Sequence, residues 1–522
     1  MRAEEKKKSN PVSAFLDRTF HVTERGSSIG QEAWAGAGAF CVAVCALLMN
    51  TQMIGTYYGN YAGSYFAVSL LTFIGTVVLG AVFNLPLMMT ANLTLSTVMI
   101  SMLGANTGLT YPNVLLVTFI AAVIALVIAL TPLKLVLVDA LPAGVRKALP
   151  VALGLYVIMT AVENTGLVSD GVLTAAQDYT NLENLYFWLA IAMMVLVTIY
   201  LAVKRTNAFG STYFLIIAAM WVLGILFYLD YFLGGQTATT VVYQRLNLIV
   251  ATDGASPYTI AAGISSLHIG QLFSEGLDFS EFTANGGNVA LFIAQGVMTY
   301  LFLGMYTSLG DADGAQAAAG LAPLDAKTEK QVLITSSAAN VVSPILGGSP
   351  LAVAPQSAMA TKDGAKTGLS SVVAGIGFLI ALFNWIFFAL FATGTNGVGM
   401  WINDTETKLA AYVQDSFLFA DVIMIFVGIV MLKAVKEVAV DKKEEFLPFA
   451  AVLVLTVFGG NLVLGAAAGT ILAFVLQLFE PDRKNTKLSF VLLTIIMIVY
   501  AYLVLQYGGD YLINTVASAS PF

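Results

Sequence analysis

Charge and reactive side chains are scarce in this chain of 522 residues. Charged residues make up 11% of it, against roughly 25% in a typical soluble domain. The two cysteines, Cys41 and Cys45, lie one helical turn apart in an apolar run, which excludes a disulfide framework. The two histidines have no other metal ligands near them, and no P-loop or dinucleotide-binding glycine motif occurs. We therefore expect no enzyme active site, no metal, no organic cofactor and no nucleic-acid partner.

Apolar residues, in contrast, make up 58% of the chain. About 20 consecutive apolar residues cross a bilayer as a helix, so the length suits a dozen or more spans with short loops. The first apolar run is of full span length and follows a polar N-terminal segment, so we expect no cleavable signal peptide. The predicted spans form two groups of seven around a polar interval, 231–286, with one further run at the end: 33–52, 61–83, 87–104, 112–133, 146–163, 184–203 and 211–230, then 287–309, 331–346, 350–362, 368–393, 417–434, 446–460 and 461–479, and finally 488–507.

The basic residues support this assignment through the positive-inside rule. With a cytoplasmic N-terminus and an extracellular 231–286 interval, 22 of the 24 Lys and Arg residues fall on the cytoplasmic side. The two exceptions are Arg245 and Lys408. A missed or additional span would invert every later loop and destroy the pattern. We therefore expect a multi-pass protein of the bacterial cell (inner) membrane.

Two of the apolar runs are interrupted by proline and cannot be ordinary membrane helices. Leu85 to Ser96 reads LPLMMTANLTLS, and Gly347 to Thr361 reads GGSPLAVAPQSAMAT. We expect each to be an extended piece followed by a short helix. Irregular backbone at membrane depth is tolerated where it lines a cavity, and a helix that begins there presents free N–H groups. Transporters build substrate sites in this way.

The two segments correspond to one another. When Pro86 is aligned with Pro350, a side-chain amide follows six residues later in each, at Asn92 and at Gln356. Each segment is the third span of its group of seven. An odd number of spans per half places the two halves in opposite orientations, so we expect inverted repeats.

Polar side chains at this depth are the candidates for a binding site: Thr90, Asn92 and Thr94 in the first segment, and Gln356 and Ser357 in the second. An alternative is that such groups satisfy backbone exposed by the break or hold helices together. For Asn92 and Gln356 we favour binding, since each stands at a helix start facing its counterpart. For the hydroxyl residues the structural alternative is the stronger one.

The span that begins near 287 ends in the run GMYTSLGDADG. Tyr306 and Thr307 lie in its last part, and Asp311 follows Thr307 by one turn on the same helix face if the helix continues. One interpretation makes Asp311 and Asp313 a hydrated helix end. The other makes Asp311 an ion or proton site, because a carboxylate inside a membrane normally marks function.

Four stretches resemble a known family. They are FHVTERGSSIGQEAWAG (Phe20 to Gly36), the LGGSPLAVAPQSA run, KTGLSSVVAG (Lys366 to Gly375) and VGIVMLKAVKEV (Val427 to Val438). With this spacing over nearly the whole length, the chain resembles a divergent member of the nucleobase/ascorbate transporter family. The similarity is to its adenine/guanine/hypoxanthine permease branch.

The resemblance implies an all-α integral membrane protein of about fourteen spans, in two inverted seven-span repeats with the uracil-permease-like fold. It also implies a homodimer and an elevator movement of a core domain against a gate domain. The expected organisation is a cytoplasmic N-terminus 1–30, core first half 31–134, gate first half 135–230, extracellular loop 231–286, core second half 287–393, gate second half 394–479, and a C-terminal segment 480–522 with a possible extra span.

The chain departs from the family where chemistry is expected. Thr307 stands where members carry a carboxylate, Gln356 where they carry Glu, and Cys45 where they carry Tyr. An ionised Glu only accepts hydrogen bonds, whereas Gln donates and accepts, so the ligand preference should differ. The loss of both acids suggests that coupling has moved, with Asp311 as the candidate, or has been lost.

The first hypothesis is a secondary transporter for a purine-like nucleobase or related small heterocycle. Asn92, Gln356 and the backbone N–H groups that follow them would hold its polar edges, two aromatic rings would stack on it, and Thr307 would add a hydrogen bond. The substrate-binding residues predicted on this basis are Phe40, Thr90, Asn92, Leu93, Thr94, Tyr306, Thr307, Ala354, Gln356 and Ser357, with Asp311 as a possible H⁺ or Na⁺ coupling residue. The partners expected are a small-molecule substrate and the lipid bilayer.

Two alternatives keep the same fold. Two opposed helix N-termini without a neutralising carboxylate would suit a small organic or inorganic anion. A channel-like facilitator without ion coupling is the other alternative.

Overall fold

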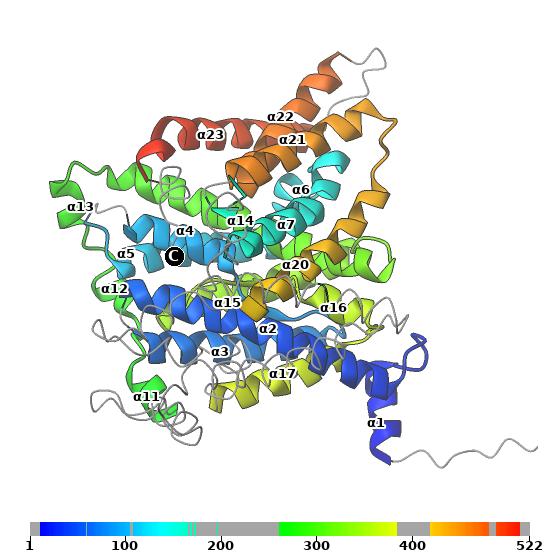
Figure 1. Cartoon of the computed structure of the whole chain (residues 1–522). Coiled ribbons are helices and arrows are strands. Elements are labelled where there is room, and N and C mark those ends of the chain that lie inside the picture. The colour runs from blue at the N-terminus through cyan, green and yellow to red at the C-terminus, as the bar shows by residue number, and fades with distance from the viewer. Residues whose placement is uncertain are drawn as a thin grey trace, which may run out of the picture.

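The computed structural model describes residues 11–58, 60–104, 108–164, 168–169, 172–173, 195, 260–383, 418–479 and 487–511. Helices dominate these ranges (Figure 1), as the all-α prediction requires. The predicted spans 184–203 and 211–230, most of the 231–286 interval, and residues 384–417 lie outside the described residues.

The helices of the first half follow the predicted spans closely. They are α1 (Pro11–Phe20), α2 (Ile29–Tyr58), α3 (Tyr61–Val77) with a π-helical turn η1 (Val78–Val82), α4 (Leu93–Gly104), α5 (Tyr111–Leu130), α6 (Lys134–Leu137) and α7 (Ala143–Asn164). The segment predicted to break does so, because the strand β1 (Met89–Ala91) precedes α4. Two more short strands, β2 (Val168–Ser169) and β3 (Val172–Leu173), pair after α7.

The second half repeats part of this order, since two helices again precede a strand and a short helix. It comprises α11 (Ile260–Ser265), α12 (Gln271–Ser274), α13 (Ser280–Ala284), α14 (Val289–Ala319), α15 (Ala326–Ile345), the strand β4 (Leu351–Val353), α16 (Ser357–Lys362), α17 (Gly368–Phe383), α20 (Leu418–Met431) with a 3-10 turn η5 (Leu432–Glu437), α21 (Lys443–Gly459), α22 (Leu462–Leu478) and α23 (Leu488–Tyr511). Four described helical segments are long and apolar enough to cross a membrane: Ala62–Val82, Tyr111–Leu130, Val289–Ala319 and Leu488–Leu505.

Two elements differ from the sequence-based expectation. The helix α14 does not end near 309 but continues to Ala319, where Gly320 in the left-handed conformation closes it. The described end of the 231–286 interval is also not an open loop, since it folds into α11, α12 and α13. The first difference matters for the site, because Asp311 then lies inside a helix and not at a hydrated end.

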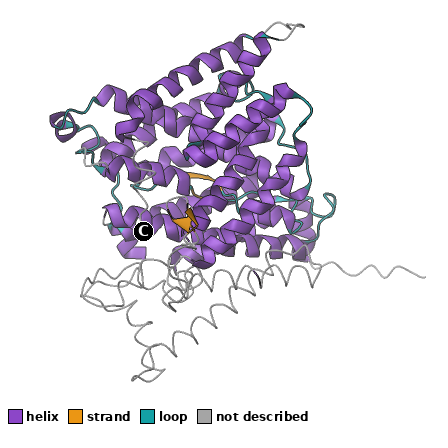
Figure 2. Ribbon diagram, turned by 45° about the horizontal axis from the view of Figure 1, so that its top comes forward, coloured by secondary structure: helices purple, strands orange, loops and turns teal. Residues whose placement is uncertain are grey.

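The centre of the molecule is a two-stranded antiparallel ladder (Figure 2). In it Met89 pairs with Val353, Thr90 with Ala352 and Ala91 with Leu351. Each strand precedes a short helix, so two broken segments from opposite halves of the chain cross side by side. The two prolines predicted the extended piece and the short helix of each segment, and the pairing of the two strands is seen in the structure.

Each strand is held on its outer edge by one polar side chain. The Thr76 hydroxyl accepts from the Met89 N–H at 3.0 Å and donates to the Met89 carbonyl at 3.1 Å. The Asn340 amide does the same for Leu351, at 2.6 Å and 2.7 Å. Buried backbone groups need such partners, so these clamps allow extended chain to lie inside a helical bundle.

The helices pack in two groups around this ladder. In Figure 1, α2, α3, α15 and α17 lie together, with α17 against both α2 and α3 and α15 against α5. The helices α7, α20, α21 and α22 form the second group, and α23 packs on α22. The long helix α14 contacts both groups, since it touches α5 and α16 as well as α7.

A buried charge cluster joins α6, α7 and α15 near the end of α14. The Glu329 carboxylate is 1% exposed and accepts from Lys134 at 2.9 Å and from Arg146. Arg146 also lies 3.8 Å from Asp313, whose other oxygen accepts from the Leu324 N–H at 2.8 Å. Asp313 is therefore a structural residue with its own partners.

Candidate functional site

A cavity of about 70 Å³ opens where the crossing segments face α7 and α20. Its lining includes seven residues predicted from the sequence as site residues: Thr90, Asn92, Leu93, Thr94, Thr307, Asp311 and Gln356. They come from the first broken segment, the second broken segment and α14. The broken segments and α14 therefore meet at one place, as the sequence analysis required.

Asn92 stands where β1 ends and α4 begins. Its side-chain oxygen accepts from the Leu95 N–H at 2.9 Å, which caps the helix. Its backbone N–H donates to the Pro350 carbonyl at 3.1 Å and so extends the ladder to the other segment. Asn92 thus binds both its own helix and the opposite strand, while its side chain still lines the cavity.

Gln356 occupies the corresponding place before α16, yet its side chain makes no capping bond there. The residue is fully buried. Its amide nitrogen lies 3.1 Å from the Met424 sulfur, and its amide oxygen has no partner in the described part of the chain. In the described structure the Gln356 side chain therefore makes no hydrogen bond to a backbone group, unlike that of Asn92.

Thr307 and Asp311 face the cavity from one side of α14, as the one-turn spacing predicted. The Thr307 hydroxyl donates to the Leu303 carbonyl at 2.7 Å within its own helix. Asp311 is 3% exposed, and its Oδ1 has no hydrogen-bond partner among the described residues. A buried oxygen without a partner is costly, so Asp311 is a candidate to act on a ligand or proton.

The Thr90 hydroxyl is a third buried oxygen in the lining, after those of Gln356 and Asp311. Thr90 lies in β1 and is 2% exposed, and its hydroxyl is also unpaired within the described ranges. No Lys or Arg belongs to the lining formed by the described residues, where Asp311 is the single acid. The cavity therefore offers polar oxygens and no cation.

Four of the predicted site residues do not line this cavity. Phe40 packs edge-on against Phe378 at 5.1 Å, in the contact between α2 and α17. Tyr306 is fully buried on another face of α14 and donates to the Leu137 carbonyl at 3.3 Å. Neither aromatic ring is therefore placed to stack on a ligand there.

The other two hold the broken segments together. The Ala354 N–H donates to the Met88 carbonyl at 2.8 Å, and the Ser357 hydroxyl accepts from the Met88 N–H at 3.0 Å. The structural interpretation that the sequence favoured for the hydroxyl residues thus describes Ser357.

The wall of the cavity formed by α7 and α20 was not predicted from the sequence. Tyr156 on α7 is the aromatic residue of the lining in the described structure, and Met424 on α20 lies beside Gln356. The two helices cross at Gly154 and Gly428, where an added Cβ on either residue would meet the other backbone. Tyr156 and Met424 lie in ordinary apolar runs, so the periodicity of the sequence did not indicate that they line a cavity.

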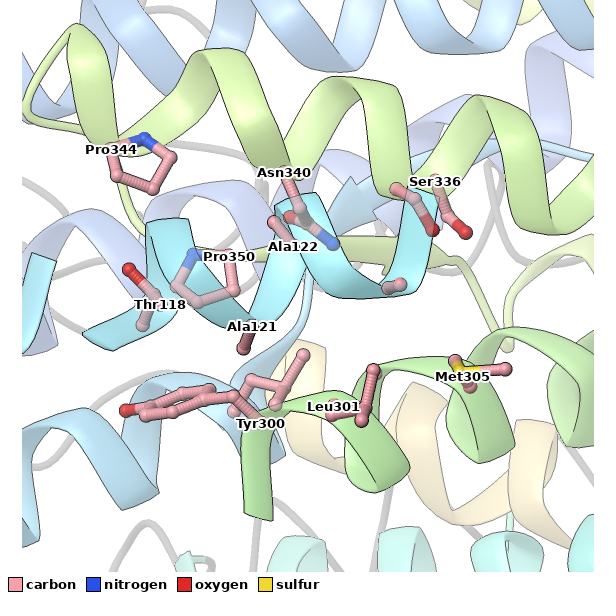
Figure 3. Close-up of a pocket in the computed structure, with 14 residues that line it drawn as sticks. Thr118, Ala121, Ala122, Tyr300, Leu301, Met305, Ser336, Asn340, Pro344 and Pro350 are labelled. Carbon is pink, nitrogen blue, oxygen red and sulfur yellow. The ribbon is translucent and has the colours of Figure 1, made fainter. Parts of the chain in front are cut away.

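A second cavity of about 30 Å³ lies between α5, α14 and α15, next to Pro350. Figure 3 shows Asn340 and Ser336 on one side of it and Tyr300 and Leu301 on the other. Since Asn340 already clamps Leu351, this space borders the backbone support of the ladder. Its size suits about one or two water molecules, so the larger cavity is the better candidate for a substrate. In the described residues no group of three or more His, Cys, Asp or Glu side chains could hold a metal ion.

Known proteins are similar to the chain over most of its length. A putative permease of Haemophilus influenzae is 21% identical over 93% of this chain and 98% of its own length. The guanine/hypoxanthine permease GhxP of Escherichia coli O157:H7 is 22% identical over 93% of this chain and 96% of its own. No family model matches the chain. The chain is a divergent relative of the nucleobase permeases. The resemblance seen in the sequence is thereby confirmed, and so is the expectation of a permease and not an enzyme.

A solved structure confirms the fold class of this transporter. The murine Solute Carrier 26 family member A9 anion transporter, in the inward-facing state, superimposes with a TM-score of 0.50 at 10% identity. The match covers 91% of this chain and 74% of that one. At this identity the likeness concerns the fold alone. Together with the permease relatives, this likeness shows a multi-pass membrane transporter of the predicted fold class.

Proposed function

We propose that the protein carries a purine-like nucleobase across the membrane and binds it in the cavity between the broken segments and α7 and α20. The observation that carries this proposal is that oxygens of Thr90, Asp311 and Gln356 have no partner in the described part of the chain, and that no Lys or Arg is among the described residues of the cavity lining. Nucleobases present N–H donors at their ring edges, which complement such oxygens. Relatives named guanine/hypoxanthine permeases support the same class of substrate.

The ring faces of a nucleobase also fit this cavity. Tyr156 supplies an aromatic surface from α7, and Met424 and Leu153 supply apolar contacts. Stacking of a base on an aromatic side chain contributes about 1–3 kcal/mol. We assign to Tyr156 the stacking role that the sequence analysis gave to Phe40 and Tyr306.

Alternating access would follow from the two helix groups. The crossing segments, with α2, α3, α5, α14, α15 and α17, would form the moving core, and α7, α20, α21 and α22 the gate, within a homodimer. The cavity lies where these groups meet, so a shift of one past the other would carry the substrate from one side to the other. At Gly310, α14 lies close to α7, since an added Cβ would meet the Leu153 side chain. A helix surface without a side chain at this point would allow α14 to slide on α7.

Coupling is assigned to Asp311. A carboxyl group that lies inside the bundle and faces the substrate can bind a proton on one side and release it on the other. An imposed proton gradient should therefore drive accumulation of purine in proteoliposomes, and Asp311→Asn should abolish accumulation while leaving exchange of purine across the membrane. Accumulation by Asp311→Asn equal to that of the wild type would remove Asp311 from this role.

Uptake by the purified protein in proteoliposomes tests the substrate class. We expect radiolabelled guanine, hypoxanthine or adenine to be taken up and to compete with one another, while bicarbonate, sulfate and short carboxylates do not compete. The alternative of an anion substrate predicts the reverse result. Asp311 lines the cavity with no Lys or Arg among the described lining residues, which disfavours an anion when Asp311 is ionised, because like charges at short range repel.

A further inference from the structure

The contact between Met424 and Gln356 joins the two walls of the cavity. Gln356 precedes α16 in the second broken segment, and Met424 is on α20 opposite. The Gln356 amide nitrogen lies 3.1 Å from the Met424 sulfur. Met424 is 7% exposed and clusters with Ala161 and Val157 of α7, so its position is fixed by packing.

This contact favours one orientation of the amide. A thioether sulfur can accept a weak hydrogen bond but has no hydrogen to donate. The amide NH₂ can therefore face Met424 favourably, whereas the amide oxygen would meet a second acceptor. With the nitrogen held by sulfur, the Gln356 oxygen remains as a buried acceptor without a partner in the described structure.

We propose that Met424 is a positioning residue that fixes the polarity of the Gln356 amide and thereby selects purines with N–H donors on the recognised edge. The inference rests on the proposed function. With Asp311 as a second acceptor in the same cavity, the ligand should present more than one N–H group. Guanine fits this requirement, because its N1–H and 2-amino groups are adjacent donors, whereas N1 of adenine is an acceptor.

The test compares the affinities for guanine and adenine in the full-length protein. Leu has a volume close to that of Met and has no acceptor atom, so Met424→Leu should fold. It should leave the amide free to turn, and the preference for guanine over adenine should fall about tenfold, the equivalent of one oriented hydrogen bond. A merely structural defect would weaken both purines alike and leave their ratio unchanged.

The same substitution in a Gln356→Glu protein tests whether the effect of Met424 acts through the Gln356 amide. Gln356→Glu replaces the amide by a carboxylate, which offers acceptors in either orientation, so Met424→Leu should no longer change the guanine-to-adenine ratio there. Met431→Leu is the matched control, since Met431 is a fully buried methionine of the same helix that does not line the cavity. We expect Met431→Leu to keep the wild-type ratio.

The outcomes are distinguishable. An unchanged ratio in Met424→Leu, or an equal change in the Gln356→Glu background, would overturn the positioning role while the purine substrate stands. Failure of the wild-type protein to bind any purine would overturn the proposed function and this inference with it. A ratio that falls in Met424→Leu and not in Met431→Leu or in the Gln356→Glu background would support both.

Discussion

The two broken segments are alike in backbone and unlike in what their amide side chains do. Both place an extended strand before a short helix, and each strand is clamped by one polar side chain from a neighbouring helix. Asn92 then uses its oxygen to cap α4. Gln356 makes no capping bond, and its buried oxygen has no partner among the described residues.

This difference follows from side-chain length. Asn is among the residues preferred at helix N-caps, since its short side chain places the oxygen near the free N–H groups of the first turn. Gln is one methylene longer and reaches beyond the helix start, here to Met424. We therefore propose that the first segment acts mainly as support and that the second recognises the ligand.

Gln356→Ala should give the largest effect on binding. It removes the unpaired acceptor from a buried site, so we expect a loss of purine affinity of about thirtyfold. Thermal stability should be unchanged or slightly higher, since the side chain caps no helix. Purine titration with a melting curve on the same sample measures both, and an affinity equal to that of the wild type would place recognition elsewhere.

Tyr156→Ala tests whether the wall opposite the segments supplies the ring contact. Loss of one stacking surface should weaken purine binding about tenfold. Tyr156→Phe keeps the ring and should bind purine within about twofold of the wild type, because stacking needs only the aromatic face. A matched aromatic control is Phe40→Leu, which we expect to leave affinity unchanged because Phe40 packs on Phe378 away from the cavity.

Asn92→Ala should reverse the pattern of Gln356→Ala. The loss of the cap on α4 should lower the free energy of unfolding by about 1 kcal/mol, while purine affinity should fall only about threefold. Asn92→Asp retains an oxygen that can cap and should recover the stability. A large affinity loss with no change in stability in Asn92→Ala would make the two segments equivalent and break the comparison.

Ser357→Ala should have the smallest effect. Its hydroxyl accepts from the Met88 N–H and does not line the cavity. We expect a loss of stability of about 1 kcal/mol and no change in the guanine-to-adenine ratio. A changed ratio, measured by competition binding, would show that Ser357 reaches the ligand.

The sequence predicted the backbone of the site better than its walls. Pro86 and Pro350 located both broken segments, although Pro150 lies inside the continuous helix α7, so a proline alone does not mark a break. The spacing of Thr307 and Asp311 gave their shared face because both lie on one continuous helix. These are local properties of the chain.

The aromatic contacts depend on packing and could not be read in this way. Phe40 and Tyr306 lie on α2 and α14, which both contribute residues to the cavity lining, but the Phe40 ring packs on Phe378 and the Tyr306 hydroxyl bonds to the Leu137 carbonyl. Tyr156 and Met424 reach the cavity because α7 and α20 cross closely at a pair of glycines. That crossing brings together residues more than 250 positions apart, and the sequence around each of them does not indicate it.

A structure of the full-length transporter with bound guanine tests the central claim most directly. We predict a ring or amino nitrogen of guanine at hydrogen-bond distance, about 2.9 Å, from the Gln356 oxygen, with the ring against Tyr156 and the Asn92 oxygen still on the Leu95 N–H. Guanine bound away from Gln356, or an Asn92 side chain that leaves α4 to hold the base while Gln356 does not, would contradict the assignment of support to the first segment and recognition to the second.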